Sequence, residues 1–260
     1  MTLTYPEFHL LFVLPPLALL AVAGRRTRAQ WAGIGLLALL AFVYTTPWDN
    51  YLIYRGVWSY GEGTLLGRVG YTPFGEYAFF ALQPVLTGLW YYRVAPEIAP
   101  EEPPAPFRAR AAGAAAWLLL ALVGGLLLTA PSGYYLGAIL VWAGPIAALQ
   151  WGFGGPVLYH HRRLLVVAVG VPTLYLCFAD AIAIGNGVWT ISTALSSGVL
   201  VLGLPVEEAV FFLVTNVLVV NGLVLLDWVL ARVAVGGVAH GVEGLVPDER
   251  LVARVRARWG

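Results

Sequence analysis

Two adjacent carboxylates, Glu207 and Glu208, stand at the head of the apolar run "GLPVEEAVFFLVTNVLVV". An ionisable side chain within a membrane helix is costly and usually marks a functional site that faces the helix bundle. A carboxyl group in an apolar site, close to a second carboxylate, can keep its proton at neutral pH and act as a general acid. The alternative is helix capping, because Pro205 suits a first helical turn and an acid there complements the helix dipole.

The same pattern occurs earlier in the chain, so the sequence contains an internal repeat. The segment "WDNYLIYRGVWSY" aligns with "ADAIAIGNGVWTI", and "TPFGEYAFF" aligns with "LPVEEAVFF". Asp49 thereby matches Asp180, and Glu76 matches Glu208. Glu207 has no counterpart, because Gly75 stands at its position. We expect the five acids to lie near the same ends of their helices, as candidate catalytic groups.

Composition places these acids in a membrane protein. The chain has 260 residues, of which 60% are hydrophobic and 11% are charged, whereas soluble domains carry about 25% charged residues. A net charge of +1 gives no reason to expect a nucleic-acid partner. One cysteine and four histidines without metal-ligand spacing predict no metal site and no thiolate cluster, and no motif predicts a bound cofactor.

The fold class we expect is all-α and integral to the membrane, because a spanning helix needs roughly 20 apolar residues. Seven segments qualify, at about 5–23, 30–48, 74–94, 112–130, 134–153, 164–184 and 206–230. They form two parallel three-helix repeats plus a connecting helix, with Pro15 and Pro145 at similar places in the first and fifth spans. Such copies should be related by a pseudo-two-fold axis along the membrane normal, with a cavity between them. The expected units are 1–94 and 134–232 as the two repeats, 95–133 as a proline-rich linker with the connecting helix, and 233–260 as an arginine-rich tail.

The arginines indicate the orientation in the membrane. With seven spans, thirteen of the fifteen arginines fall on one side, and only Arg55 and Arg68 fall on the other. The positive-inside rule then puts the N-terminus outside and the C-terminus in the cytoplasm of a multi-pass cell-membrane protein. The arginine-rich tail 233–260 is expected to form a short helix on the anionic inner leaflet.

Aromatic side chains beside a proton donor suit a carbocation intermediate, which the ring quadrupole stabilises. For a substrate-binding role we therefore single out the aromatic residues near the acids, with one amide deep in the last span: Trp58, Trp189, Phe79, Phe80, Phe211, Phe212 and Asn216. Each has an ordinary alternative. Tryptophans commonly lie in interfacial belts, phenylalanines usually pack in cores, and a membrane asparagine commonly links helices.

The PVEE segment with its two phenylalanines, the repeated Asp…Gly-Val-Trp block and the seven predicted helices together resemble the small integral-membrane lycopene cyclases. The resemblance covers about residues 1–232, as though the two subunits of the heterodimeric type were joined in one chain. It implies acid-catalysed, non-redox cyclisation of the ψ-ends of lycopene to β-ionone rings. It also implies a carotenoid substrate taken from the lipid phase. The family's acids carry over to Glu207, Glu208 and Glu76, and Gly75 departs from the pattern. The resemblance therefore implies that the second copy is the catalytic half, with Glu208 or Glu207 as the acid and Asp180, Asp49 or Glu76 assisting. A homodimer is compatible with the sequence.

Three other readings are weaker. A retinal protein is excluded, because the chain contains no lysine to form the Schiff base. An intramembrane prenyltransferase needs several aspartates for Mg²⁺ and diphosphate, whereas Asp49 and Asp180 stand alone in their segments. A proton-coupled carrier would use buried acids at a repeat interface. It predicts a polar central pathway, and the helices here are almost wholly apolar.

Overall fold

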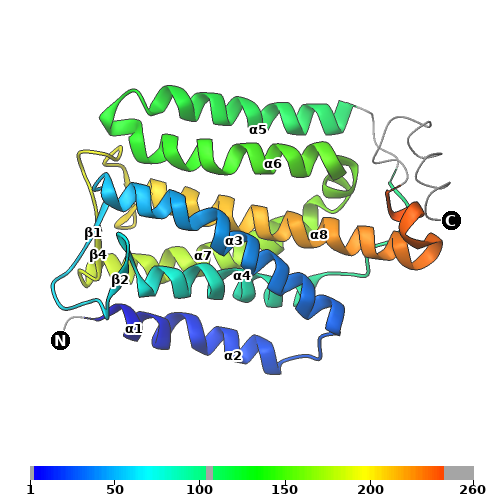
Figure 1. Ribbon diagram of the computed structural model, residues 1–260, viewed down its shortest axis with the longest axis horizontal. Coiled ribbons are helices and arrows are strands. Elements are labelled where there is room, and N and C mark those ends of the chain that lie inside the picture. The colour runs from blue at the N-terminus through cyan, green and yellow to red at the C-terminus, as the bar shows by residue number, and fades with distance from the viewer. Residues whose placement is uncertain (1–2, 104–107, 243–260) are drawn as a thin grey trace.

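The computed structural model describes residues 3–103 and 108–242, with side chains as far as residue 236. Long helices lie side by side, and short strands gather at one end of the bundle (Figure 1). The helices are α1 (Tyr5–Phe8), α2 (Leu14–Val22), α3 (Arg28–Tyr54), α4 (Phe74–Val94), α5 (Arg108–Leu127), α6 (Tyr134–His160), α7 (Arg162–Gly185) and α8 (Val206–Val242). The strands are β1 (Trp58–Tyr60), β2 (Arg68–Val69), β3 (Thr72–Pro73), β4 (Trp189–Ile191), β5 (Leu200–Val201) and β6 (Leu204–Pro205).

The all-α membrane fold is confirmed. Among the described residues, six helical segments are long and apolar enough to cross a membrane: Tyr5–Val22, Arg28–Tyr54, Arg108–Leu127, Pro131–His160, Arg162–Gly185 and Val206–Gly236. The remaining long helix, α4, is not among them, and it carries the polar residues Glu76, Gln83 and Thr87. The seven-span repeat therefore stays a prediction.

Several boundaries differ from those expected. A π-helical turn, His9–Val13, joins α1 to α2, so Pro15 and Pro16 fall in the first turn of a new helix, where a missing N–H costs nothing. Helix α3 continues through Pro47 to Tyr54, which places Asp49 inside the helix. The loops expected around the two tryptophans contain short antiparallel strands. The first ten residues of the expected tail continue α8, and the rest of the tail lies outside the described residues.

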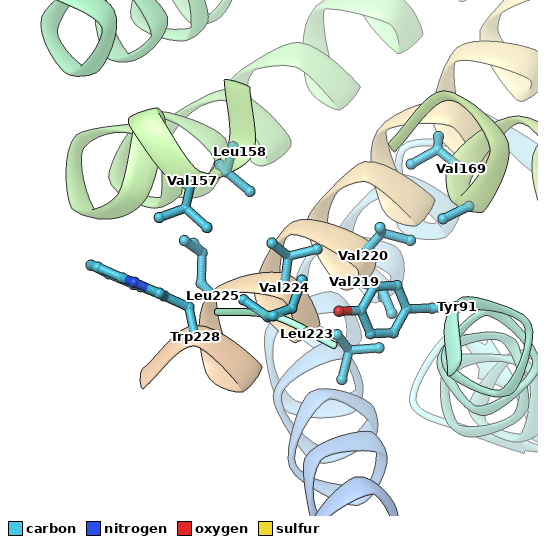
Figure 2. Close-up of a cluster of buried hydrophobic side chains, with 12 residues drawn as sticks. Tyr91, Val157, Leu158, Val169, Val219, Val220, Leu223, Val224, Leu225 and Trp228 are labelled. Carbon is cyan, nitrogen blue, oxygen red and sulfur yellow. The ribbon is translucent and has the colours of Figure 1, made fainter. Parts of the chain in front are cut away.

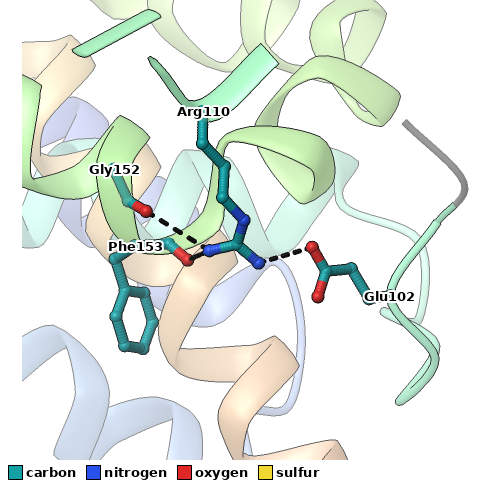
Figure 3. Close-up of polar contacts among 4 residues, drawn as sticks. All are labelled: Glu102, Arg110, Gly152 and Phe153. Atoms are coloured by element: carbon teal, nitrogen blue, oxygen red, sulfur yellow. Dashed lines mark hydrogen bonds and ion pairs between the residues drawn. The ribbon is translucent and has the colours of Figure 1, made fainter. Parts of the chain in front are cut away.

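Helix α6 is kinked at Gly154, whose backbone is not helical. Pro156 has no N–H to offer the carbonyl of Gly152 one turn earlier. The guanidinium of Arg110, on α5, donates instead to the carbonyls of Gly152 (3.3 Å) and Phe153, and it also pairs with Glu102 of the linker (Figure 3). One arginine thus compensates the kink and holds the linker and α5 against α6.

The two copies make matching contacts around one point. Strand β1 pairs antiparallel with β4, and Ser59 lies opposite its own counterpart, Thr190, with the hydroxyl oxygens 2.9 Å apart. On one side of this point the Tyr44 hydroxyl donates to the carbonyl of Trp142 at 2.9 Å. On the other side the Tyr175 hydroxyl donates to the carbonyl of Phe12 at 2.8 Å. Copies related by a two-fold axis through the Ser59 pair would make these contacts.

The opposite end of the bundle is a packed hydrophobic core around α8. Val220, Leu223 and Val224 are fully buried there, between Tyr91 of α4 and the end of α6 (Figure 2). The phenol of Tyr91 donates to Asp227 at 2.9 Å, which satisfies the one carboxylate on this part of α8. This core fixes the long helices relative to one another, so the residues at the strand end are held on a rigid support.

Candidate active site

Four of the five predicted acids meet at one cavity beneath the strands, which we call the acid chamber. Asp49 comes from the end of α3 and Asp180 from the end of α7, while Glu76 and Glu208 begin α4 and α8. The chamber volume is about 40 Å³, which is enough for a few water molecules at most. Four negative charges in so small a buried space would repel one another, which favours the protonated form for some of these carboxyl groups.

The two aspartates accept hydrogen bonds from neutral donors. The Thr72 hydroxyl donates to Asp49 Oδ2 at 2.7 Å. The indole N–H of Trp189 donates to Asp180 Oδ1 at 2.8 Å, and Asp180 Oδ2 is buried without a hydrogen-bond partner. A buried, unpartnered carboxyl oxygen is costly in a purely structural role. Asp180 therefore presents a free proton-accepting or proton-donating atom at the chamber.

The two glutamates accept from phenols. The Tyr60 hydroxyl donates to Glu76 Oε1 at 2.9 Å, and the Tyr135 hydroxyl donates to Glu208 Oε1 at 2.7 Å. Burial, followed by the nearby carboxyl group of Glu76, raises the pKa of Tyr60 well above its ordinary value, so this phenol remains a donor. A phenol thus orients each glutamate, and the Tyr5 phenol also contacts Glu76.

Glu207 does not line the acid chamber, although its side chain is fully buried. Its Oε1 accepts the backbone N–H of Ser197, in the loop between β4 and β5, at 2.6 Å, and its Oε2 has no hydrogen-bond partner. Successive residues on a helix point about 100° apart, which turns Glu207 toward the loop when Glu208 faces the chamber. The adjacent acids therefore lie in different surroundings.

The glycine that replaces this acid in the first copy has a steric cause. A Cβ on Gly75 would come within 2.4 Å of the ring of Tyr5. The carbonyl of Gly75 also accepts the Nε2–H of His9 at 2.9 Å, which leaves His9 Nδ1 as a buried nitrogen without a partner. No side chain fits at position 75 while Tyr5 keeps this place.

A larger, apolar cavity adjoins the acid chamber. This lateral cavity has a volume of about 250 Å³ and lies between α3, α4, α6 and α8. Phe79 and Phe211 line both cavities, so they form the partition between them. The other wall residues are Leu37, Leu40, Ala41, Tyr44, Thr45, Phe80, Gln83, Trp142, Ile146, Gln150, Thr215, Leu218 and Val219.

The predicted binding residues divide between the two cavities. Trp58, Trp189 and Phe212 line the acid chamber, and Phe80 lines the lateral cavity. Asn216 is fully buried and lines neither cavity. Its amide links three helices, with Oδ1 accepting from Gln83 (2.7 Å) and Thr87 (2.6 Å) and Nδ2 donating to Thr173 (3.0 Å). These contacts fit the role of Asn216 as a link between helices rather than a role in substrate binding.

The sequence reading missed the phenols that hold the glutamates. Tyr135, which holds Glu208, and Tyr5, which contacts Glu76 beside Tyr60, stand ten residues before the matched prolines Pro145 and Pro15. Extending the repeat alignment would have found these two. Each ring packs on a tryptophan of the other copy: Tyr135 on Trp58 at 5.1 Å and Tyr5 on Trp189 at 4.8 Å between ring centroids. The crossed strands β1 and β4 bring these rings together.

The fold and the site together define a multi-pass, all-α membrane protein with a chamber of carboxyl groups separated from an apolar cavity by two phenylalanine rings. Within the described residues, no group of three or more His, Cys, Asp or Glu side chains is placed to hold a metal ion. Such a site can move protons to and from an apolar substrate.

Comparison with known proteins identifies the family. The chain is 47% identical over 242 residues to a lycopene beta-cyclase of Halobacterium salinarum, an alignment that covers 89% of this chain and 99% of that protein. It is also 36% identical over 234 residues to a bifunctional lycopene cyclase/phytoene synthase of Sporisorium reilianum, covering 85% of this chain and 34% of that protein. The corresponding protein of Aspergillus oryzae is 33% identical over 239 residues, covering 89% and 41%. The chain belongs to the lycopene cyclase family. No protein-family model and no solved structure matches it.

Proposed function

We propose that this protein is a lycopene beta-cyclase of carotenoid biosynthesis that cyclises the ψ-ends of lycopene by proton transfer. The observation that carries the site assignment is the meeting of four carboxyl groups beside an apolar cavity. The family relationship supports the substrate and the product, because the Halobacterium relative bears the name lycopene beta-cyclase. The apolar helices support a substrate that arrives from the lipid phase.

In the proposed reaction a carboxylic acid protonates C2 of the terminal double bond, and a tertiary cation forms at C1. The C5=C6 bond then attacks C1 and closes the ring, and a carboxylate removes a proton from C6 to give the β-ring. One proton is added and one is lost, so the reaction has no net redox change and calls for no redox cofactor.

We assign the proton-donating role to Glu208, because Tyr135 orients its carboxyl group at the chamber wall. We assign the proton-accepting role to Asp180, because its Oδ2 has no hydrogen-bond partner. Asp49 and Glu76 are the other two acids that line the chamber. Phe79, Phe211 and Phe212 line the same chamber, where an aromatic quadrupole can stabilise a cation.

We also propose a location in the cell membrane. The arginine distribution supports insertion in the cell membrane with the strand end and the acid chamber outside and the C-terminus in the cytoplasm. Homodimer formation stays a prediction of the sequence, to be measured as the mass of the purified protein in detergent.

The test is expression in a lycopene-accumulating bacterium, followed by pigment chromatography. The wild-type chain should convert lycopene to β-ring products, and Glu208→Gln should lose most of this activity at equal protein level. Glu62→Gln, on the exposed loop between β1 and β2, is the matched control. Unchanged lycopene with well-expressed wild-type protein refutes the cyclase function, and it would return the prenyltransferase and carrier alternatives to consideration. Full activity in Glu208→Gln refutes the assigned proton donor.

A further inference from the structure

The lateral cavity reaches the edge of the bundle between α3 and α6. Leu40 and Tyr44 line it from α3, and their side chains are 54% and 40% exposed, although both belong to the cavity wall. Ile146 and Gln150 line it from α6 and are half-buried. Residues that are both cavity wall and outer surface mark an opening, and in a membrane-spanning helix this surface faces lipid.

The opening is closed toward the strand end. The Tyr44 hydroxyl bonds the carbonyl of Trp142, and the indole N–H of Trp48 bonds the carbonyl of Ala138 at 3.3 Å. Trp48 and Trp142 also stack on each other, with ring centroids 4.8 Å apart. These contacts seal α3 to α6 beside the acid chamber. Access to the chamber from this side therefore passes through the lateral cavity and its partition.

The corresponding region across the pseudo-two-fold axis is filled by side chains. Leu176, the counterpart of Thr45, is buried there against Phe79, Phe80 and Phe212, with Leu17 and Leu20 of α2 packed around them. Ala168, which matches Leu37, is fully buried as well. The hollow is thus a feature of one copy, and it lies beside the partition formed by Phe79 and Phe211.

We propose that the lateral cavity is the binding site for the polyene chain of the substrate, and that the gap between α3 and α6 is its portal from the bilayer. This inference rests on the proposed function. The cavity volume is about 250 Å³. A lycopene molecule is several times larger, so only one end enters at a time and the rest of the chain stays among the lipid acyl chains. The ψ-end then lies against Phe79 and Phe211, and displacement of these rings joins the two cavities.

Two pairs of neighbouring residues test the portal by added bulk. Leu40→Trp and Ile146→Trp place an indole in the opening, whereas Leu39→Trp and Leu149→Trp place it on the exposed lipid face of the same helices, away from the cavity wall. We expect the portal variants to consume lycopene about tenfold more slowly or worse, which corresponds to about 1.4 kcal/mol or more. The two control variants should stay within about twofold of wild type, about 0.4 kcal/mol on the same scale.

A second version of the experiment removes any effect on folding. Leu40→Cys and Leu39→Cys are made in a Cys177→Ala background, because Cys177 is the single native cysteine. The purified, folded proteins are treated with a bulky apolar thiol reagent. Blocking should abolish turnover at position 40 and leave it intact at position 39. Binding is read separately in Glu208→Gln protein, as quenching of tryptophan fluorescence by added lycopene.

The outcomes separate the two proposals. Wild-type protein that consumes no lycopene refutes the cyclase function itself. Active wild-type protein with equal activity in the portal and control variants, both as tryptophans and as blocked cysteines, overturns the portal. The portal is supported if the variants at positions 40 and 146 lose both turnover and fluorescence quenching while the control variants at positions 39 and 149 keep both.

Discussion

Glu207 and Glu208 are adjacent in sequence, and the structure predicts opposite consequences when each loses its charge. Glu207→Gln keeps an oxygen that can accept the Ser197 N–H, now 2.6 Å from Oε1. Glu207→Ala removes the acceptor of this N–H on an exposed loop and leaves a cavity where the fully buried carboxyl side chain stood, which costs about 1–3 kcal/mol. We therefore expect Glu207→Gln to retain activity within a few fold, and Glu207→Ala to lose stability.

The assay compares Glu207→Gln, Glu207→Ala and Glu208→Gln at equal protein level, by initial lycopene consumption in membranes and by thermal melting in detergent. Glu208→Gln should melt close to wild type and lose activity by orders of magnitude, because the variant cannot donate the proton. Glu207→Ala should melt several degrees lower. A Glu207→Gln variant that melts like wild type and yet is as inactive as Glu208→Gln would contradict this division of roles, since Glu207 would then act on the substrate.

Three further substitutions probe the supports of the site. Tyr135→Phe removes the donor to Glu208, and initial rates should fall about twofold to tenfold, as for loss of one hydrogen bond between neutral groups. An unchanged rate and pH profile would show that the phenol does not orient Glu208. Gly75→Ala drives a methyl group into Tyr5, and thermal melting should report about 1–3 kcal/mol of destabilisation, whereas a wild-type melting curve would contradict the close packing. Arg110→Ala leaves the carbonyls at the α6 kink without their hydrogen-bond donor. The variant should have a lower melting temperature and an unchanged rate per folded molecule. A catalytic defect without destabilisation would contradict this structural role of Arg110.

Much of this architecture is readable from residue types and spacing. The alignment of Asp49 with Asp180, and of Glu76 with Glu208, predicted that these acids share one end of the bundle, and all four line one cavity. That success has a physical basis. Carboxyl groups are too costly in apolar helices to be placed at random, and a duplicated chain returns each one to a symmetry-related position.

Other features depend on three-dimensional packing that no local pattern reports. The separation of Glu207 from Glu208 follows from the helix phase and from the position of the Ser197 loop. Short strands such as β1 were not expected, because three residues give no usable alternation of polar and apolar positions. The lateral cavity is a packing void between four helices, and composition alone does not show where side chains leave such a void.

The differences between the copies matter more for chemistry than their likeness. Symmetry supplies matched acids, but a site with two identical halves would have no reason to donate a proton from one and accept it at the other. In this chain the halves differ at the places that surround the acids. Gly75 faces Tyr5 and His9, whereas its counterpart Glu207 binds a loop amide. Tyr60, which holds Glu76, is matched by an isoleucine, Ile191. With the substrate cavity open in one half only, an end group meets the four carboxyl groups from a single direction, and this fixed approach is what allows one of them to serve as acid and another as base.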